Sequence, residues 1–442
     1  MEQILLKDEK WNGEKMSTKD KTNRMSRISR MLIVFLIVAI SSIVPQSASA
    51  NPTSEIQLNP GELMENSRLG RSIAIEENLV VVGAPEASDE EAFGCGAAYV
   101  FKRQGNAYVL EAKLIAPDPT IGSEFGRVVA IEGNTIVVGA RFATSGDVER
   151  AGAAYIFRNI GGSWIFDQKL NASDGSPEDN FGRAVALHGD LLVVTARKED
   201  VSEENEGAAY VFRRTGGSWT EEARITASDG TIDARFGQSV AIMDNDMIAV
   251  GARDADSPTA KACGAVYIFQ GLANEWVETA KLTASDGAKG DQFAFNLATQ
   301  GNVIVVGARR SDPQGLKDAG AAYIFSKTKS GWTETAKLMA SDAKGGDEFG
   351  HSVAMDGNFI AVGARRADID MNPDQGAVYL FRRADNQWVE VTKLLASNGG
   401  AGDEFGHSLS AHGNAIAVGA QFADNPTCDE GAAYVFKLNG IK

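Results

Sequence analysis

Two histidines occupy the same place in two copies of one heptapeptide. The stretch GDEFGHS spans residues 346–352 and again 402–408, so that His351 and His407 lie 56 residues apart. Other polar side chains stand at the same distance after earlier copies of the aromatic-glycine pair: Arg71, Arg127, Arg183 and Gln238. Arginine and histidine gathered at one place would bind an anionic group. The alternative is packing and ion pairing between strands, and two histidines without a third ligand make a poor zinc site.

A second candidate site is the segment DIDMNPDQG, residues 368–376. Oxygen-bearing side chains stand at alternate positions along it: Asp368, Asp370, Asn372 and Asp374. Alternating oxygen ligands are how calcium-binding loops begin. The segment has Pro373 where such a loop has glycine, and it lacks the terminal glutamate, so an acidic, solvated loop is the alternative. The still more acidic segment KEDVSEENEG, residues 198–207, has the same two interpretations.

Other charged residues recur along the chain and are interpreted as structural. Aspartates recur in pairs: Asp174 and Asp179, Asp229 and Asp233, Asp286 and Asp291, Asp342 and Asp347. Aspartate and glycine in such loops suit turns and hydrogen bonds from side chain to backbone. An arginine follows a short apolar strand five times: Arg141, Arg197, Arg253, Arg309 and Arg365. We expect these arginines to pair with loop carboxylates, an arrangement that is ordinary in structural networks.

The aromatic-glycine pair also sets the period of the chain. The pair or a close variant begins at seven positions: Leu69, Phe125, Phe181, Phe236, Phe293, Phe349 and Phe405. The steps are 55 to 57 residues, and seven such units account for residues 51–442. In the sixth unit, segments 349–355, 359–364, 376–381 and 388–396 read as strands separated by turn residues. The pattern predicts an all-β, seven-bladed β-propeller of four-stranded antiparallel blades.

The last unit contains only three predicted strands. Residues 54–58, SEIQL, precede Leu69 by the spacing of the fourth strand in the other units. We therefore expect the N-terminal strand to complete the last blade and to remove an exposed edge. In such a ring the residues equivalent to His351 lie near the mouth of the central channel. The long connections gather at one end of the blades, which is the default place for binding.

The first 50 residues differ from the rest. Basic residues precede the apolar run MLIVFLIVAISSIV, residues 31–44, and SASA ends at Ala50. This order is typical of a secretory signal peptide, and the run is short for a membrane span, which needs about 20 residues. An uncleaved signal anchor is the alternative. We expect residues 1–50 to be a signal peptide and residues 51–442 to form a single propeller, secreted or at the cell surface and not inserted in the membrane.

Charge and cysteine content narrow the class of protein. The net charge is −16, and removing the eight basic and five acidic residues of the leader leaves 35 basic and 54 acidic residues, a net of −19. Such a surface repels nucleic acid and anionic lipid. Cys95, Cys263 and Cys428 match neither a disulfide-rich scaffold nor a zinc spacing. Blades 1 and 7 are neighbours in a closed ring, so Cys95–Cys428 is the disulfide that is sterically possible.

The Phe-Gly openings and the GAP at residues 83–85 resemble the FG-GAP repeat family. Units such as WTETAKLMASDAKGGDEFGHSVAMDGNFIAVGARRAD, residues 332–368, are similar to its bacterial extracellular branch. The same repeat builds the seven-bladed head of integrin α subunits. The resemblance implies extracellular binding or adhesion, often with calcium. In integrin-like blades the calcium loop joins the first two strands; here that connection is only EGN, HGD, MDND or DGN, too short to surround a cation that takes six to eight oxygens.

These observations favour a secreted, non-catalytic binding or adhesion protein whose loop-rich face contacts an extracellular protein or glycan. A calcium-dependent structural component of an envelope or matrix is one alternative, and an enzyme with a site at the channel mouth is another. No Ser-His-Asp order or metal triad in the sequence supports catalysis, so no catalytic residue is assigned. Calcium is the only cofactor that the sequence suggests.

Overall fold

The computed structural model describes residues 54–61, 63–88, 94–244, 246–258, 260–272, 275–385, 387–424 and 428–438. The signal peptide predicted for residues 1–50 lies outside these residues. Apart from one short 3-10 helix, η1 (Pro313–Gly315), every regular element in the described ranges is a β-strand. Accordingly, none of the described elements is a helix long and apolar enough to cross a membrane.

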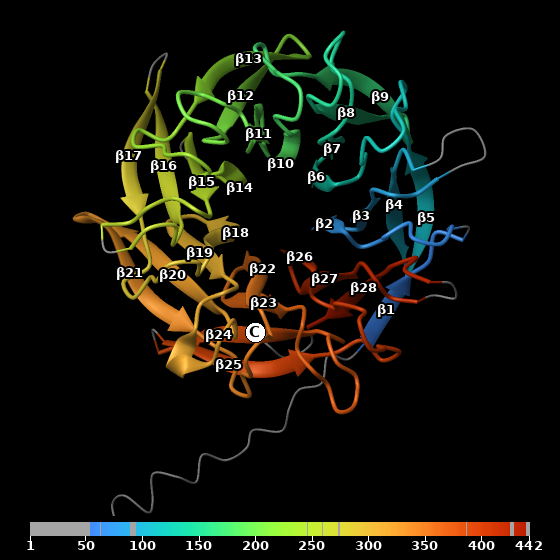
Figure 1. The fold of residues 1–442 in the computed structure, drawn as a ribbon. Helices are drawn as coiled ribbons and strands as arrows, with labels where there is room; N and C mark the ends of the chain where they lie inside the picture. The colour runs from blue at the N-terminus through green and yellow to red at the C-terminus, as the bar shows by residue number, and fades with distance from the viewer. Residues whose placement is uncertain are drawn as a thin grey trace, which may run out of the picture. The chain divides into compact units, whose positions relative to one another are not determined.

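The described strands form seven antiparallel sheets of four strands, here called blades 1 to 7 (Figure 1). Blade 1 contains β2 (Ser72–Glu76), β3 (Leu79–Ala84), β4 (Ala97–Gln104) and β5 (Ala107–Leu114). Blade 2 contains β6 (Val128–Glu132), β7 (Thr135–Ala140), β8 (Ala153–Ile160) and β9 (Ser163–Leu170). Blade 3 contains β10 (Phe181–His188), β11 (Leu191–Ala196), β12 (Ala208–Thr215) and β13 (Ser218–Ile225).

The next three blades repeat this order. Blade 4 contains β14 (Phe236–Met243), β15 (Met247–Ala252), β16 (Ala265–Leu272) and β17 (Glu275–Leu282). Blade 5 contains β18 (Phe293–Gln300), β19 (Val303–Ala308), β20 (Ala321–Thr328) and β21 (Gly331–Leu338). Blade 6 contains β22 (Phe349–Asp356), β23 (Phe359–Ala364), β24 (Ala377–Ala384) and β25 (Gln387–Leu394).

Blade 7 is built from both ends of the described chain. It contains β26 (Ser408–His412), β27 (Ala415–Ala420) and β28 (Ala432–Lys437), and β1 (Ser54–Leu58) is its fourth strand. In Figure 1, β1 in blue lies beside β28 in red, and their register runs from Ser54 opposite Lys437 to Leu58 opposite Ala433. The first strands of successive blades contact one another, and β26 contacts β2. The predicted all-β, seven-bladed propeller is confirmed.

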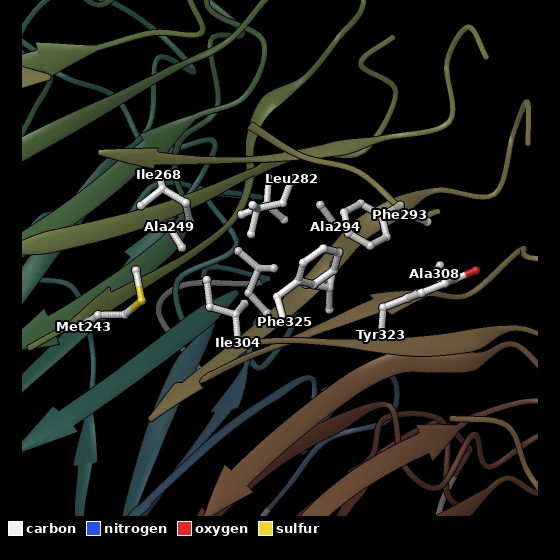
Figure 2. Close-up of a cluster of buried hydrophobic side chains, with 14 of the residues drawn as sticks. Met243, Ala249, Ile268, Leu282, Phe293, Ala294, Ile304, Ala308, Tyr323 and Phe325 are labelled. Carbon is white, nitrogen blue, oxygen red and sulfur yellow. The ribbon is translucent and has the colours of Figure 1, made fainter. Parts of the chain in front are cut away.

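The hydrophobic core consists of layers between adjacent blades. In the layer between blades 4 and 5, Met243 and Ile268 face Phe293, Tyr323 and Phe325 (Figure 2). Phe293 meets Tyr323 and Phe325 edge-on, with ring centroids 5.5 and 5.9 Å apart. The same three-ring contact recurs from blade 2 to blade 7 because the opening phenylalanine and the third strand keep their spacing.

The glycine after the opening phenylalanine joins each blade to the one before it. Gly350 has a φ of +88°, and a Cβ atom there would lie 2.3 Å from the carbonyl oxygen of Ala321 in blade 5. Glycine adopts this conformation most readily and tolerates so close an approach, and blade 5 has the small residue Ala294 there at a φ of +67°. The amide of Phe349 donates to the carbonyl of Ala319 at 2.9 Å. The pair therefore fixes where the following residue, His351, enters the ring.

Candidate functional site

Three positions in each blade bring polar side chains around the ring axis. The inner position is the second residue after the opening aromatic residue, the outer position follows the second strand, and the entry position precedes the opening aromatic residue. The inner residues are Arg71, Arg127, Arg183, Gln238, Phe295, His351 and His407. The outer residues are Pro85, Arg141, Arg197, Arg253, Arg309, Arg365 and Gln421. The entry residues are Arg68, Glu124, Asn180, Arg235, Gln292, Glu348 and Glu404.

The seven inner residues all line the central channel. At its mouth, most of them share a cavity of about 260 Å³ with outer residues of blades 3 to 7. Inner and outer positions adjoin the long connections, whereas the short hairpin turns close the other end of each blade. The residues that the sequence pattern grouped, Arg71, Arg127, Arg183, His351 and His407, are therefore brought together at the loop-rich end.

Positive charge exceeds negative charge at this mouth. The three positions hold ten arginines and three glutamates, although the whole chain has a net charge of −16. The excess is unevenly distributed around the ring. At these three positions, blades 5 to 7, called the neutralised sector, contain Glu348 and Glu404, whereas blades 1 to 3, called the arginine sector, contain only Glu124.

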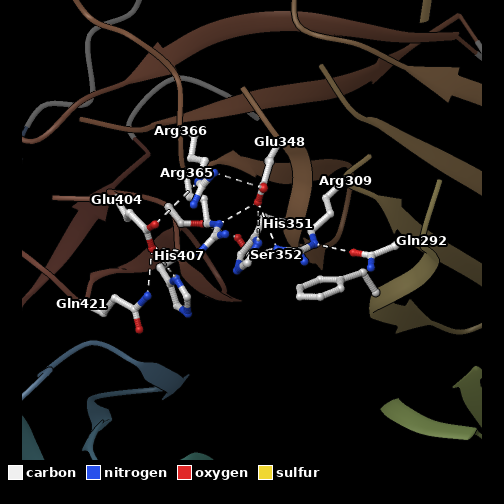
Figure 3. Close-up of polar contacts among 12 residues, drawn as sticks. Gln292, Arg309, Glu348, His351, Ser352, Arg365, Arg366, Glu404, His407 and Gln421 are labelled. Atoms are coloured by element: carbon white, nitrogen blue, oxygen red, sulfur yellow. Dashed lines mark hydrogen bonds and ion pairs between the residues drawn. The ribbon is translucent and has the colours of Figure 1, made fainter. Parts of the chain in front are cut away.

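In the neutralised sector, arginines join neighbouring blades through buried carboxylates (Figure 3). Arg309 donates to Gln292 of its own blade at 2.8 Å and to Glu348 of the next blade at 3.1 Å. Arg365 repeats the arrangement with Glu348 at 2.8 Å and Glu404 at 2.9 Å. Charge-assisted hydrogen bonds of this kind are the strong ones. The expected pairing with carboxylates is confirmed for Arg309 and Arg365, as it is for Arg141 and Arg253, whereas Arg197 has no carboxylate partner among the described residues.

The two histidines belong to this network. His407 lies between Glu404, 3.2 Å from its Nδ1, and Arg71, which donates to its Nε2. This network places the ring proton on Nδ1. His351 stacks at a tilt on His407, with centroids 4.7 Å apart, and its Nδ1 lies 3.6 Å from Glu348. Both rings are buried at 5% exposure.

Burial and arginine neighbours set the protonation states in this sector. Burial lowers the pKa of His351 and His407 well below the ordinary value, and the nearby arginines lower both further. Burial would raise the pKa of Glu348, but Arg309 and Arg365 outweigh it, so the pKa lies below its ordinary value. At neutral pH the histidines are therefore neutral and Glu348 is ionised.

The arginine sector has fewer partners for its charges. Arg141 binds Glu124 through two hydrogen bonds of 2.8 and 2.7 Å, and Arg127 shares the same carboxylate at 3.1 Å. Arg183 has no acidic partner among the described residues, and its Nε lacks a hydrogen-bond acceptor there. Arg197 reaches only the amide oxygen of Gln238, at 3.2 Å.

The excess of positive charge in this sector contributes to the lowered pKa values of its arginines. Burial, followed by repulsion from neighbouring arginines, lowers the pKa of Arg71 and Arg183 well below the ordinary value. The same causes lower the pKa of Arg127 to about 10 and that of Arg197 to about 9. Guanidinium groups still stay charged at neutral pH. The sector is thus a partly buried patch of positive charge that an anion would relieve.

Comparison with known proteins settles the family. The FG-GAP repeat matches seven times, at residues 53–101, 108–157, 164–212, 219–269, 276–325, 332–381 and 388–436. The chain belongs to the FG-GAP repeat family. It is similar to integrin alpha-7 of Rattus norvegicus, Mus musculus and Homo sapiens, at 30% identity over 154 residues or 32% of this chain. The matched stretch is only 13% of the rat protein and 12% of the other two.

The calcium candidate of this FG-GAP chain lies in the loop between β23 and β24. Asp368 uses one carboxylate oxygen to accept the amide of Asp374 at 3.0 Å, and Asn372 donates to Gln375 at 3.0 Å. Aspartates at the same place in four other blades cap their loops in the same way. These side chains therefore hold the loop backbone. Calcium binding here stays a prediction, which a calcium titration of thermal stability would test.

Recurring aspartates elsewhere in the FG-GAP blades have structural partners. Asp286 accepts hydrogen bonds from Tyr323 at 2.8 Å and Lys337 at 2.6 Å, and the same trio is present in blades 4 and 6. Asp291 accepts a backbone amide at 3.0 Å, and its equivalents do likewise. The expected side-chain-to-backbone bonds are confirmed for Asp179, Asp291 and Asp347, whereas the first aspartate of each pair binds side chains.

The disulfide considered between Cys95 and Cys428 is absent from the described chain. Cys95 is buried, and its carbonyl accepts the amide of Phe125 in blade 2 at 3.2 Å. Cys428 is exposed, and its carbonyl accepts the amide of Asn66 at 3.0 Å, at the start of blade 1. The pairing that the sequence left open is therefore not formed, because each loop packs on the following blade, which separates the two cysteines by one blade.

Sequence reasoning missed the entry position. Its residues vary between arginine, asparagine, glutamine and glutamate, so no repeated letter marks them. The signal was nevertheless present, because Glu348 and Glu404 immediately precede the opening phenylalanines. Aligning the seven units column by column would have shown that this position decides how much of each arginine's charge is balanced.

Proposed function

We propose that this FG-GAP propeller is a secreted or cell-surface, non-catalytic binding or adhesion protein. Its loop-rich face contacts an extracellular protein or glycan, and an acidic group of that ligand enters the channel mouth. The observation that carries this proposal is the patch of arginines with few carboxylate partners, in a chain that is otherwise strongly acidic. The similarity to integrin α subunits supports the extracellular role.

The charge distribution favours a particular kind of ligand. A localised positive patch attracts an acidic group over a Debye length of about 8 Å at physiological salt. The surrounding negative surface repels a long polyanion such as nucleic acid. A protein or glycan carrying isolated acidic groups satisfies both conditions.

The loops around the mouth also offer apolar contacts. Met371, in the loop between β23 and β24, is 94% exposed, and Ile121, between β5 and β6, is 76% exposed. Exposed apolar side chains beside a polar patch are what a binding interface uses for affinity. The loop-rich end therefore combines a charged centre with apolar points on its rim.

A binding screen on the whole chain tests the proposal. We expect binding to immobilised acidic glycans or surface proteins, weakening as salt is raised. Met371→Ser should reduce this binding. Leu272→Ser is the matched control, because Leu272 is 54% exposed at the opposite end of blade 4, where the hairpin turns lie. Equal effects of the two substitutions, or hydrolysis of a screened compound without stable binding, would count against the proposal.

A further inference from the structure

We propose that the arginine sector is a binding site for one tetrahedral oxyanion, a sulfate or phosphate group, held between the inner arginines of blades 1, 2 and 3. This inference rests on the proposed function, because it names the acidic group that the channel mouth receives. It is stated for Arg71, Arg127 and Arg183, and for the two neighbours that border them, Arg197 and Gln238.

The repeat places three guanidinium groups at equivalent heights in the channel. Arg71, Arg127 and Arg183 stand at the same position of three successive blades, and all three line both the channel and the cavity at its mouth. The Phe-Gly junction, which is Leu69-Gly70 in blade 1, fixes the backbone at each of these positions, as it does before His351. Three cationic forks therefore approach one volume from three directions.

That arrangement suits a tetrahedral anion better than a carboxylate. A planar carboxylate is satisfied by one arginine fork through two parallel hydrogen bonds, as Glu124 is by Arg141. Sulfate and phosphate present oxygens in several directions and carry up to two negative charges, so that separate forks can each bind a different oxygen. Three converging arginines match the second geometry.

The existing partners leave this binding capacity unused. Arg127 shares Glu124 with Arg141, and Arg71 donates to a neutral imidazole. Within the described ranges, the Nε atoms of Arg127, Arg183 and Arg197 are buried without an acceptor. Buried donors in proteins are nearly always hydrogen-bonded, and a buried charge without a partner is costly. An oxyanion would supply acceptors and negative charge together.

The opposite side of the mouth argues for a single site. In the neutralised sector, Glu348 and Glu404 already take up Arg309 and Arg365 and would repel a second anion. The ring therefore offers one place for one anionic group, displaced from the axis toward blades 1 to 3.

Isothermal titration calorimetry on the full chain tests this site with sodium sulfate, sodium phosphate and sodium acetate at constant ionic strength. We expect one sulfate or phosphate per chain and weaker binding of acetate. Arg183→Gln should weaken sulfate binding about 10- to 100-fold, because it removes a charged hydrogen-bonding group. This variant should fold, since blade 4 has Gln238 at the same position. Arg103→Gln, an equal charge change on the exposed end of β4, should leave binding unchanged.

A sulfated disaccharide and its desulfated form separate the two sources of the group. Tighter binding of the sulfated sugar than of inorganic sulfate identifies an ester on a glycan, whereas tighter binding of the inorganic ion identifies the free anion; either supports the site. Acetate binding as tightly as sulfate, unchanged binding by Arg183→Gln, or no binding of sulfate and phosphate would overturn it. In those cases a positive screen against other acidic ligands would still uphold the proposed function.

Discussion

The two sides of the channel mouth use the same arginine positions with opposite electrostatic results. In the neutralised sector, Arg309 and Arg365 connect successive blades through Glu348 and Glu404, and little charge is left over. In the arginine sector, Arg197 occupies the same outer position but bonds to the neutral amide oxygen of Gln238, and the inner Arg183 has no acidic partner in the described chain. The repeated backbone decides where the charges lie, and the residue at the entry position decides whether they stabilise the ring or remain available to a ligand.

The largest expected effect is the loss of the carboxylate that two blades share. Glu348→Gln replaces the charged group between Arg309 and Arg365 with a neutral amide, which removes the only carboxylate partner of Arg309 in the described chain and leaves Arg365 with Glu404 alone. We expect the free energy of unfolding to fall by about 3 kcal/mol. Urea denaturation monitored by circular dichroism measures it. Glu178→Gln is the matched control, because its ion pair with Arg150 is 48% exposed on both sides and should be worth less than about 1 kcal/mol. Equal losses in both variants would mean that the shared carboxylate is not a structural link.

The arginine sector should respond with the opposite sign. Arg183→Gln removes a partly buried charge that other arginines repel, so in buffer free of sulfate and phosphate we expect stability to rise by about 1–2 kcal/mol. The same urea denaturation reports it. Adding sulfate should stabilise the wild-type protein more than the variant, through mass action on the folded state. A clear loss of stability in anion-free buffer would show that Arg183 has a structural role instead.

The sequence predicted the fold almost completely because the residues that determine the fold recur in every unit. The features that predict the fold are the seven copies of the aromatic-glycine pair or a close variant, the short hairpin turns and the spacing of residues 54–58. Each of these local features allows only one arrangement of the strands. The grouping of Arg71, Arg127 and Arg183 with His351 and His407 followed from that register alone.

The sequence could not show which of the arginines at the channel mouth have a carboxylate partner. Whether Arg183 is neutralised depends on two entry residues, Asn180 of its own blade and Arg235 of the next. The entry residue differs between units, and Arg235 is distant from Arg183 in the sequence. The sequence also left the role of Asp368 open, because a calcium loop and a self-capped loop use the same aspartates. Whether Cys95 and Cys428 pair could not be decided either, because the order of the blades does not show on which blade each loop packs.

The carboxylate of Glu199, in the loop between β11 and β12 of blade 3, makes stability depend on pH. Burial and a hydrogen bond shared with Asp179 raise the pKa of Glu199 to about 8, whereas arginines lower the pKa of Glu348. Because the pKa of Glu199 is higher in the folded state than in the unfolded state, its proton favours folding. This contribution to the free energy of unfolding is complete below the unfolded pKa of 4.5 and is lost as the pH rises toward 8. We therefore expect wild-type stability to fall between those pH values, on the order of 1 kcal/mol.

The repeats provide the control for this prediction. The position of Glu199 holds alanine in five other blades: Ala87, Ala143, Ala255, Ala367 and Ala423. Glu199→Ala should therefore fold and should reduce the pH dependence, which thermal melts at pH 5, 6, 7 and 8 would record. A stability difference between variant and wild type that stays constant across this range would contradict the proton held by Glu199.

The smallest expected effect separates the twin histidines. His407 is hydrogen-bonded on both sides, by Glu404 and Arg71, whereas the Nδ1 of His351 has no hydrogen-bond partner in the described chain. We expect His407→Gln to lower the free energy of unfolding by about 0.5 kcal/mol more than His351→Gln, since one net hydrogen bond is worth about that much. Glutamine already stands at this position in blade 4, so both variants should fold.

Nuclear magnetic resonance of the ring nitrogens measures the protonation state of each of the two histidines. Because burial and arginines hold both histidine pKa values well below the ordinary range, neither ring should gain a proton as pH falls from 8 to 6.5. The His407 signals should show a proton fixed on Nδ1. Protonation of His407 within that interval would contradict this prediction. It would mean that Glu404 favours the charged ring more than the surrounding arginines oppose it.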